Sequence, residues 1–189
     1  MGKIIFFTGG ARSGKSKFAE EYIKEKKYEK KIYLATAVAF DEEMRERVKK
    51  HIEQRGNNWL TIETYKNIPE ILERELANNN YEVILFDCIT NMVTNLMILD
   101  REVDWDNVSQ VFINELEREI LEESNRILDF IRTRNIDCIF VTNELGMGLV
   151  PSYALGRYFR DICGRVNQIV AAKSDEVYLV VSGIKIKIK

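Results

Sequence analysis

The stretch Gly9–Ser16 reads GGARSGKS and follows the apolar run Ile4–Phe7. It fills every fixed position of the phosphate-binding pattern G-x-x-x-x-G-K-[ST]. Its glycines let backbone N–H groups turn inward around phosphates, and the helix expected after the loop directs its positive dipole end toward them. Lys15 would reach the outer phosphates, and Ser16 would supply a hydroxyl to a Mg²⁺ ion that bridges them. A chance glycine-rich turn is the alternative, but the strand before and the helix after the loop favour a nucleoside triphosphate site.

Short β-type runs alternate with helical stretches along the chain. The runs expected as strands are 3–8, 31–37, 59–64, 82–88, 136–142 and 176–182. Two of them, Val83–Phe86 and Cys138–Val141, are continuously apolar, as expected for central strands covered by helices on both faces. After Ser182, the alternating isoleucines and lysines of Ile184–Lys189 predict an antiparallel hairpin return with one face in water and lysines that discourage further pairing. We therefore expect an α/β fold with a mostly parallel sheet and a C-terminal antiparallel edge strand.

Composition narrows the class of protein. The 189 residues, 46% of them hydrophobic, suffice for one buried core, and no linker or low-complexity tract divides them, so we expect one nucleotide-binding catalytic domain over 1–189. The net charge of −2 offers no broad positive surface for a nucleic acid.

Neither a membrane span nor a signal peptide is recognisable, which predicts a cytoplasmic protein. Cys88, Cys138 and Cys163 are widely spaced among apolar residues, which favours reduced core thiols over disulfides, a metal cluster or a catalytic cysteine.

A long helix is expected over about 106–134. Its apolar residues recur at helical spacing, which indicates a packing face. Contact of this face with another subunit is an alternative that the pattern leaves open.

Asp87 follows the apolar run Val83–Phe86. P-loop proteins use an acidic residue at the end of a second apolar strand to hold the Mg²⁺ shell or to orient a water, and Asp87 is the candidate here. The alternative is an aspartate that only caps the next helix. The polar stretches Cys88–Leu96 and Thr142–Glu144 also follow strands, so we expect them to open on the ligand crevice at the carboxyl edge of the sheet.

His51 is the only histidine. It lies in a stretch that is predicted to be helical from Asp41 onward, with Arg47 and Arg55 four residues to either side and therefore on the same strip. Neighbouring cations would keep the imidazole neutral and nucleophilic, and the guanidiniums could stabilise charge developing at a phosphorus centre. A covalent phosphoramidate is one interpretation, and an ordinary surface or packing histidine is the other.

Four features in combination resemble one enzyme family. They are Thr8–Ser16, the single helical His51 before Trp59, the block Val141–Pro151 (VTNELGMGLVP) and the block Phe159–Gln168 (FRDICGRVNQ). Together they resemble the bifunctional adenosylcobinamide kinase / adenosylcobinamide-phosphate guanylyltransferase family of cobalamin biosynthesis, over essentially the whole chain. The resemblance implies a RecA-like P-loop NTPase fold, a three-layer sandwich, that assembles as a homotrimer.

The resemblance also implies two activities in one chain. The first phosphorylates the aminopropanol hydroxyl of adenosylcobinamide with ATP or GTP. The second transfers GMP from GTP to the resulting phosphate, giving adenosylcobinamide-GDP and pyrophosphate. In the family a histidine carries the GMP, and His51 is the residue that can match it.

Carried over residue by residue, the resemblance gives a candidate site. The implied catalytic residues are His51, Lys15 and Asp87, and Ser16 and Asp87 are the implied Mg²⁺ ligands. The positions expected to line the nucleotide site are Gly9, Gly10, Ala11, Arg12, Ser13, Gly14, Lys15, Ser16, Ala35, Thr36, Ala37, Ile52, Glu53, Gln54, Arg55, Glu63 and Asp87. Glu63 could accept hydrogen bonds from two N–H groups of guanine. The alternative is that it is a carboxylate at the end of a strand that faces solvent and binds no ligand. Arg157, Arg160, Arg165 and the loop Gly146–Pro151 could touch the substrate or a neighbouring subunit.

Three other functions compete with this one. Only one of the two activities could survive, because phosphorylation needs chiefly the phosphate loop whereas guanylyl transfer needs His51. A regulatory nucleotide switch would work by loop ordering, but no switch motif is recognisable. A small-metabolite kinase of another specificity would have no use for an arginine-flanked histidine.

Overall fold

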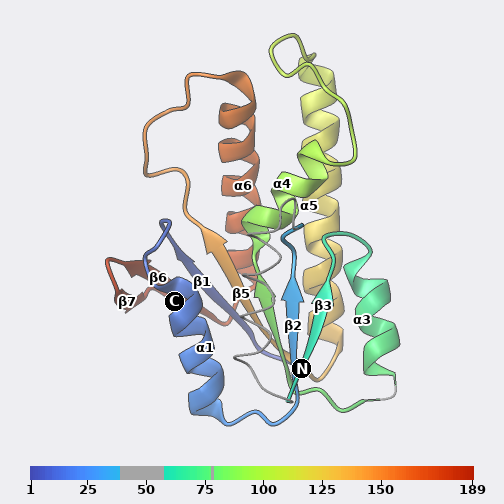
Figure 1. The fold of residues 1–189 in the computed structure, drawn as a ribbon, viewed down its shortest axis with the longest axis vertical. Coiled ribbons are helices and arrows are strands. Elements are labelled where there is room, and N and C mark those ends of the chain that lie inside the picture. The colour runs from blue at the N-terminus through green and yellow to red at the C-terminus, as the bar shows by residue number, and fades with distance from the viewer. Residues whose placement is uncertain (39–57, 78) are drawn as a thin grey trace.

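The structure is a computed structural model that describes residues 1–38, 58–77 and 79–189. Its centre is a seven-stranded sheet in the order β3-β2-β4-β5-β1-β6-β7 (Figure 1). The strands are β1 (Ile4–Gly9), β2 (Lys31–Ala35), β3 (Trp59–Glu63), β4 (Val83–Asp87), β5 (Asp137–Asn143), β6 (Glu176–Val181) and β7 (Ile184–Lys187). The helices are α1 (Lys15–Lys26), α3 (Ile68–Leu76), α4 (Ile89–Ile98), α5 (Gln110–Thr133) and α6 (Ala154–Lys173). All six predicted strands and the hairpin return are confirmed, with ends shifted by one or two residues.

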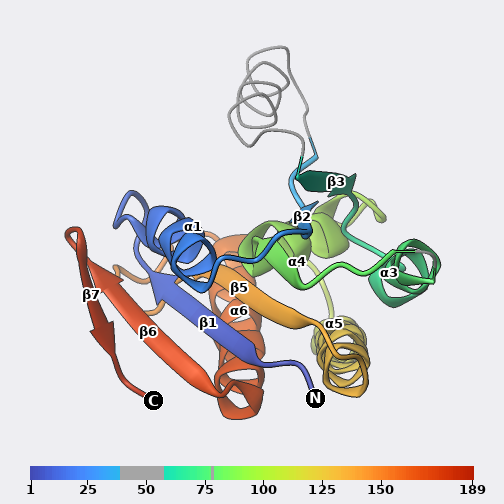
Figure 2. The same cartoon turned by 90° about the horizontal axis from the view of Figure 1, so that it is seen from below.

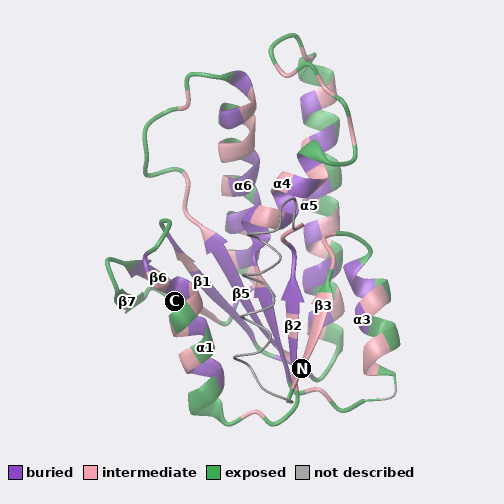
Figure 3. Cartoon of the chain, in the orientation of Figure 1, coloured by how far each residue is buried: buried purple, intermediate pink, exposed green. Residues whose placement is uncertain are grey.

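Helices cover both faces of the sheet, which explains the continuously apolar strands. In β1, Ile4 and Phe6 pack into a cluster with α3, α4, α5 and α6, whereas Ile5 and Phe7 pack against α1. Successive side chains of a strand point to opposite faces, so both faces must be apolar when both are covered. Figure 2 shows α1 on one side of the sheet and α5 and α6 on the other, and Figure 3 shows the central strands buried.

The parallel strands bring distant residues to one edge. Ala35 at the end of β2 pairs with Glu63 of β3 on one side and with Asp87 of β4 on the other. Gly9 at the end of β1 pairs with Asn143 of β5 and Val180 of β6. The phosphate loop therefore begins at the same carboxyl edge that holds Asp87 and Glu63, which is where open α/β sheets bind ligands.

The long predicted helix is α5, shorter than expected at its start. Ser109 caps it, since its side-chain oxygen accepts a hydrogen bond of 3.2 Å from the backbone N–H of Phe112. The apolar residues Ile113, Leu116, Ile120, Ile127, Leu128 and Ile131 are buried in the core. The packing interpretation of this face is confirmed, although the valine at the start of the helix, Val111, is 66% exposed.

The antiparallel edge strand β7 is confirmed, but its two faces are used differently from the prediction. Lys185 lies over the rings of Phe18 and Tyr178, and Lys187 lies over Tyr178 as well. The exposed face instead carries three isoleucines, at 184, 186 and 188. Cation–π contacts and the lysines' aliphatic stems account for the position of these lysines, because long basic side chains can cover aromatic surface while their charge stays near water.

Candidate functional site

The phosphate loop is held in shape by backbone contacts with neighbouring segments. Gly14 adopts a φ of +99°, a conformation that glycine reaches without steric cost. The N–H of Gly183, in the β6–β7 turn, donates a hydrogen bond of 2.9 Å to the carbonyl of Ser13. A β-carbon at Gly9 would lie 2.2 Å from the carbonyl oxygen of Val180, so no larger residue fits there. The glycines of the motif therefore serve both the turn and close contact with β6.

Lys15 lies folded into the loop. Its side-chain amine donates a hydrogen bond of 3.1 Å to the carbonyl of Gly10, and the residue is only 9% exposed. Burial lowers the pKa of Lys15, while nearby Cys88 and Asp87 act in the opposite direction. A triphosphate would give this ammonium the strong acceptors that it lacks, which is the task expected of a P-loop lysine.

Asp87 lies beside this lysine at the end of β4. Its carboxylate accepts a hydrogen bond of 3.2 Å from the hydroxyl of Tyr33 on β2. The residue at the N-cap of α4 is Cys88, one position after Asp87, which favours the nucleotide-site role of Asp87 over the helix-capping alternative. Ser16, in the first turn of α1, is half-buried. A carboxylate and a hydroxyl are oxygen donors of the kind that Mg²⁺ takes together with phosphate oxygens.

Metal binding by protein side chains alone finds no support in the part of the chain that the structure describes. No group of three or more histidine, cysteine, aspartate or glutamate side chains there could hold a metal ion. Mg²⁺ usually keeps few protein ligands and fills its remaining positions with water and substrate phosphates. The donor set of Ser16 and Asp87 therefore fits an ion that arrives with the nucleotide.

Thr36 ties the ends of β2 and β4 together just beyond the last ladder pair. Its hydroxyl donates to the carbonyl of Cys88 at 2.6 Å and accepts from the Cys88 N–H at 2.9 Å. The side-chain amide of Asn95 on α4 donates to the carbonyl of Thr36 at 2.6 Å. Because Thr36 is fully buried and its hydroxyl is engaged with Cys88, its side chain fixes the backbone that carries Asp87.

A cavity of about 480 Å³ lies at the ends of β2 and β3. It is lined by Thr36, Ala37, Val38, Glu63, Thr64, Tyr65 and Lys66. Glu63 is exposed, which leaves its carboxylate available to a ligand. Three predicted positions, Thr36, Ala37 and Glu63, meet here, although 26 residues separate Ala37 from Glu63 in sequence.

A second hollow, of about 330 Å³, lies between the phosphate loop and the end of β6. It is lined by Gly9, Gly10, Ala11, Arg12, Ser13, Glu144, Met147, Leu179, Val180, Val181 and Ser182. The expectation that Glu144 faces a crevice is confirmed. The β6 residues of this wall are absent from the sequence-based site, because nothing in their own sequence shows that β6 lies next to β1.

The polar stretch that follows β4 is mostly interior, which corrects the expectation that it opens on the ligand crevice. The hydroxyls of Thr90 and Thr142 lie 3.1 Å apart, and Thr142 donates to the side-chain carbonyl of Asn167 on α6 at 2.9 Å. The backbone N–H of Asn143 donates to Thr90 at 2.8 Å. These buried contacts join α4, β5 and α6 beneath the site, as buried polar groups require partners.

Five predicted site residues lie outside the described residues. They are His51, Ile52, Glu53, Gln54 and Arg55. Arg47, and the predicted helix start at Asp41, also fall in the segment 39–57 that is not described.

The cysteines are buried free thiols, as predicted. Burial raises the pKa of Cys88 to about 11, and burial likewise raises the pKa of Cys138 and Cys163. A thiol that resists ionisation is a poor nucleophile. The catalytic-cysteine alternative therefore gains no support.

The arginines of α6 have internal partners. Arg157 donates to the backbone carbonyls of Pro151 and Ser152, at 3.2 and 2.7 Å, and so anchors the loop that precedes its helix. Arg165 forms an ion pair of 3.0 Å with Glu117 on α5. Arg160 contacts its neighbour Asp161 at 3.2 Å. At least Arg157 thus has a structural role within the chain.

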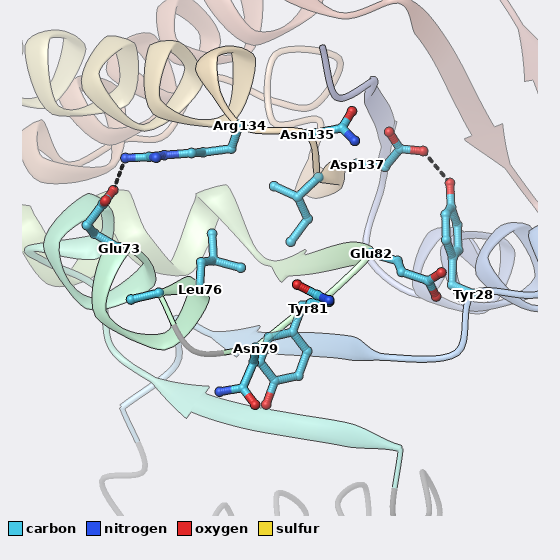
Figure 4. Close-up of a pocket in the computed structure, with 12 residues that line it drawn as sticks. Tyr28, Glu73, Leu76, Asn79, Tyr81, Glu82, Arg134, Asn135 and Asp137 are labelled. Atoms are coloured by element: carbon cyan, nitrogen blue, oxygen red, sulfur yellow. Dashed lines mark hydrogen bonds and ion pairs between the residues drawn. The ribbon is translucent and has the colours of Figure 1, made fainter.

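A further hollow, of about 620 Å³, lies at the amino ends of the strands, away from the phosphate loop (Figure 4). Its charged groups are satisfied within the protein. Arg134 forms an ion pair with Glu73, and Tyr28 donates to Asp137 at 2.5 Å. Volume alone does not make this hollow the active site, because the groups that suit phosphate chemistry lie at the opposite edge.

Known proteins resemble this chain along its length. A family model described as "Cobinamide kinase / cobinamide phosphate guanyltransferase" matches residues 5–188. The bifunctional adenosylcobalamin biosynthesis protein CobU of Escherichia coli (strain K12) is 40% identical, with 98% of this chain and 99% of the relative covered. The protein of the same name from Salmonella typhimurium is 42% identical over the same shares, and CobP of Pseudomonas aeruginosa is 34% identical over 96% and 94%.

Among solved structures, a KaiC-like protein from Pyrococcus horikoshii OT3 matches with a TM-score of 0.52 and 15% identity. The match covers 94% of this chain and 70% of that one. At this identity the likeness concerns the fold alone. The three-layer α/β fold, with a mostly parallel sheet and an antiparallel edge strand, is thereby confirmed and is shared with that KaiC-like protein.

Proposed function

The chain belongs to the cobinamide kinase / cobinamide phosphate guanyltransferase family, and we propose that it catalyses two successive reactions of cobalamin biosynthesis. It phosphorylates the aminopropanol hydroxyl of adenosylcobinamide with ATP or GTP. It then transfers GMP from GTP to that phosphate and releases pyrophosphate. The observation that carries the proposal is the phosphate loop with Lys15 buried inside it and Asp87 beside it.

In the first reaction the substrate hydroxyl oxygen forms a bond to the γ-phosphorus. The bond between that phosphorus and the β–γ bridging oxygen breaks, and the nucleoside diphosphate leaves with the electron pair. The hydroxyl proton passes to a base or to water. Lys15 and the loop N–H groups hold the phosphates and stabilise the charge that develops on their oxygens.

Mg²⁺, held by Ser16 and Asp87, would neutralise phosphate charge when it is bound with the nucleotide. The Thr36 contacts to Cys88 keep the Asp87 backbone in register with β2. Asp87 needs this support, because a carboxylate acts on a metal shell or a water only from a fixed position.

In the second reaction His51 attacks the α-phosphorus of GTP. A bond forms between the imidazole nitrogen and phosphorus, and the bond to the α–β bridging oxygen breaks, so pyrophosphate leaves from the phosphate loop. An oxygen of the cobinamide phosphate then displaces the histidine and forms the new P–O bond. This role of His51 rests on the resemblance and on the flanking arginines, since the residue lies outside the described part of the chain.

Glu63 is the proposed reader of guanine. A carboxylate can accept N–H groups from N1 and N2 of guanine together, whereas adenine offers no such pair. The position of Glu63 at the wall of the 480 Å³ cavity beside Ala37 supports this role. The remaining proposed nucleotide contacts, Ala35 and Ile52–Arg55, come from the same resemblance.

The setting of the enzyme is also part of the proposal. We infer a single catalytic domain over 1–189 that works in the cytoplasm as a homotrimer. No described helix combines the length and the apolar composition needed to cross a bilayer. The exposed apolar side chains of Leu149 and Val150 are candidates for subunit contact.

Intact-protein mass spectrometry after incubation with GTP and Mg²⁺ tests the proposed function. The expected result is a mass gain of one GMP that mild acid reverses and that maps to the His51 peptide, because a histidine phosphoramidate is acid-labile. The variants His51→Ala and His51→Asn should lose the adduct and guanylyl transfer yet keep adenosylcobinamide phosphorylation. Folded, GTP-binding protein without an adduct would leave a kinase-only enzyme as the better account.

A further inference from the structure

Two hollows open at the carboxyl edge of the sheet, on either side of the pair Lys15 and Asp87. The 480 Å³ cavity that contains Glu63 lies at the ends of β2 and β3. The 330 Å³ hollow lies at the ends of β1 and β6. In the sheet order β3-β2-β4-β5-β1-β6-β7, the strands β4 and β5 lie between them. A triphosphate held by the loop could therefore direct its base to either side.

The hollow beside β6 has walls suited to the flat faces of a base. Leu179 and Val181 are two residues apart on β6, so their side chains point to the same face, and Met147 on the loop after β5 adds a third apolar side chain. Arg12 also lines the hollow, and a guanidinium can stack on a purine ring. Its volume falls in the range of about 300–1,000 Å³ that is usual for small-molecule sites.

The same hollow contains a polar group that lacks a partner. The side-chain oxygen of Ser13 is buried and makes no hydrogen bond within the described part of the chain, and Ser13 as a whole is 7% exposed. A buried hydroxyl without a partner is costly, so such a group in a wall points to a ligand atom that completes it. Ser13 belongs to the phosphate loop, and a ribose or phosphate oxygen of a bound nucleotide is the partner of suitable chemistry.

The two sites differ in how they can read a base. Glu63 gives its cavity a carboxylate for guanine N–H groups. In the hollow beside β6, the one carboxylate among the lining residues is that of Glu144, whose Oε1 accepts a hydrogen bond of 2.6 Å from the N–H of Gly146 and so holds the side chain against its own loop. Apolar side chains and backbone contact the flat faces of a purine. Such contacts do not distinguish the hydrogen-bond donors and acceptors on the edge of adenine from those of guanine.

We propose that the hollow between the phosphate loop and β6 binds the purine of the phosphoryl donor in the kinase reaction, and that the Glu63 cavity binds guanine in the guanylyl transfer. The inference rests on the proposed function and adds a second base site to it. The two bound states exclude one another, because both triphosphates need the single phosphate loop. Phosphorylation therefore tolerates ATP and GTP, whereas GMP transfer demands GTP.

The variant Val181→Trp tests the proposal. Val181 is 47% exposed and lines the hollow, so an indole there would occupy the space of the base while the buried core stays intact. The matched control is Val111→Trp, at an exposed valine at the start of α5 that lines neither hollow. For each protein, the KM for ATP in adenosylcobinamide phosphorylation, the KM for GTP in guanylyl transfer and the Kd of the non-hydrolysable analogue AMP-PNP are measured.

Val181→Trp should raise the KM for ATP and the Kd of AMP-PNP at least tenfold and change the KM for GTP in guanylyl transfer less than twofold. Val111→Trp should change none of them. Equal effects of Val181→Trp on both reactions, or no effect on either, would overturn the proposal. If that variant does not fold, Met147→Trp replaces it, because Met147 lies in the facing wall and is 78% exposed.

If the proposed kinase and guanylyltransferase function itself were wrong, the results would differ from those that overturn the second base site. In that case the unsubstituted protein would phosphorylate no adenosylcobinamide and form no GMP adduct. The AMP-PNP measurement does not depend on either activity. A Kd that rises in Val181→Trp and stays constant in Val111→Trp would still support a base site beside β6, and an unchanged Kd would refute it.

Discussion

The backbone N–H of Gly183 donates a hydrogen bond of 2.9 Å to the carbonyl oxygen of Ser13, and so joins the β6–β7 turn to the phosphate loop. Ser182 and Gly183 have φ values of +50° and +78°, the conformation of a tight hairpin turn with two left-handed residues. The hairpin at the end of the chain thus supports the loop near its beginning.

Replacing Gly183 by alanine should destabilise the protein through the backbone alone. Open space surrounds the position of the new β-carbon, whereas the φ of +78° costs an L-residue about 1 kcal/mol. We expect the free energy of unfolding in urea to fall by about that amount. Gly148→Ala is the control, because Gly148 also has open space but no positive φ, and it should stay within about 0.5 kcal/mol of the unsubstituted protein. Equal losses at both positions would contradict this account.

Thr36→Val should weaken both the fold and the site. Valine keeps the shape of threonine but removes the two hydrogen bonds to Cys88 and leaves a buried N–H without a partner. The expected loss is about 1–3 kcal/mol in the free energy of unfolding, measured in urea, with a lower kcat for phosphorylation. Thr36→Ser keeps the hydroxyl and should recover most of both losses. A Thr36→Val protein as stable and as active as the unsubstituted one, with Thr36→Ser impaired, would mean that packing of the methyl group, not the hydroxyl, supports Asp87.

The parts of the fold that depend on local pattern were predictable. The motif Gly9–Ser16 predicts the phosphate loop and the helix that follows it. The continuously apolar runs predict central strands, because a strand covered by helices on both faces needs apolar side chains on both. The position of Asp87 at the same carboxyl edge of the sheet as the phosphate loop was also predictable, because neighbouring parallel strands end at one edge.

Other parts depend on contacts between distant segments. The sequence positions of Thr90 and Thr142, after the ends of strands, predict that they face a ligand crevice. In the structure both are buried, and their hydroxyls form a hydrogen bond with one another. The lysines of β7 suggest a face in water, yet Lys185 and Lys187 lie over the ring of Tyr178, and the isoleucines of the other face are exposed. The wall made by Leu179 and Val181 required the pairing of β6 with β1, which no local pattern encodes.

Lys15→Met should abolish catalysis without destabilising the empty protein. Loss of the ammonium should lower phosphoryl transfer at least about 100-fold, as for other preorganised charge-stabilising groups. Burial lowers the pKa of Lys15, against smaller opposite effects of Cys88 and Asp87, so the unfolded chain binds the proton more tightly than the folded one. Stability of the unsubstituted protein should therefore rise with pH between the lowered pKa and the ordinary lysine value of about 10.4.

The Lys15→Met variant should lack that rise in urea unfolding between pH 7 and pH 10.5. Lys17→Met is the matched control, because Lys17 lies on the same helix with its side chain 77% exposed. It should keep both the activity and the pH-dependent rise. A Lys15→Met protein that is less stable than the control at pH 7 would show that the lysine's hydrogen bond to Gly10 outweighs its burial cost.

Glu176→Gln should change how stability depends on acid. The hydroxyl of Tyr178 lowers the pKa of Glu176, burial opposes this, and Lys187 and Tyr22 lower it further. A lowered carboxylate pKa contributes stability that is fully present above the unfolded value of about 4.3 and is lost as the pH falls through the folded pKa. The difference in unfolding free energy between the unsubstituted protein and Glu176→Gln should therefore be largest above about pH 5 and shrink below it. A difference independent of pH from 3 to 7 would assign the effect to packing.

Glu63→Gln should separate the two reactions by their base. Replacing the carboxylate leaves one acceptor and turns an amino group toward the guanine N–H edge. Hydrogen bonds to a charged group are worth about 1.5–3 kcal/mol, so the KM for GTP in guanylyl transfer should rise about 10- to 100-fold. Phosphorylation with ATP should be unchanged, because its donor does not depend on Glu63. Glu102→Gln, at an exposed glutamate that does not line the cavity, is the control and should leave both reactions as they are. A parallel loss of ATP-dependent phosphorylation in Glu63→Gln would mean that both donors place their base in one cavity.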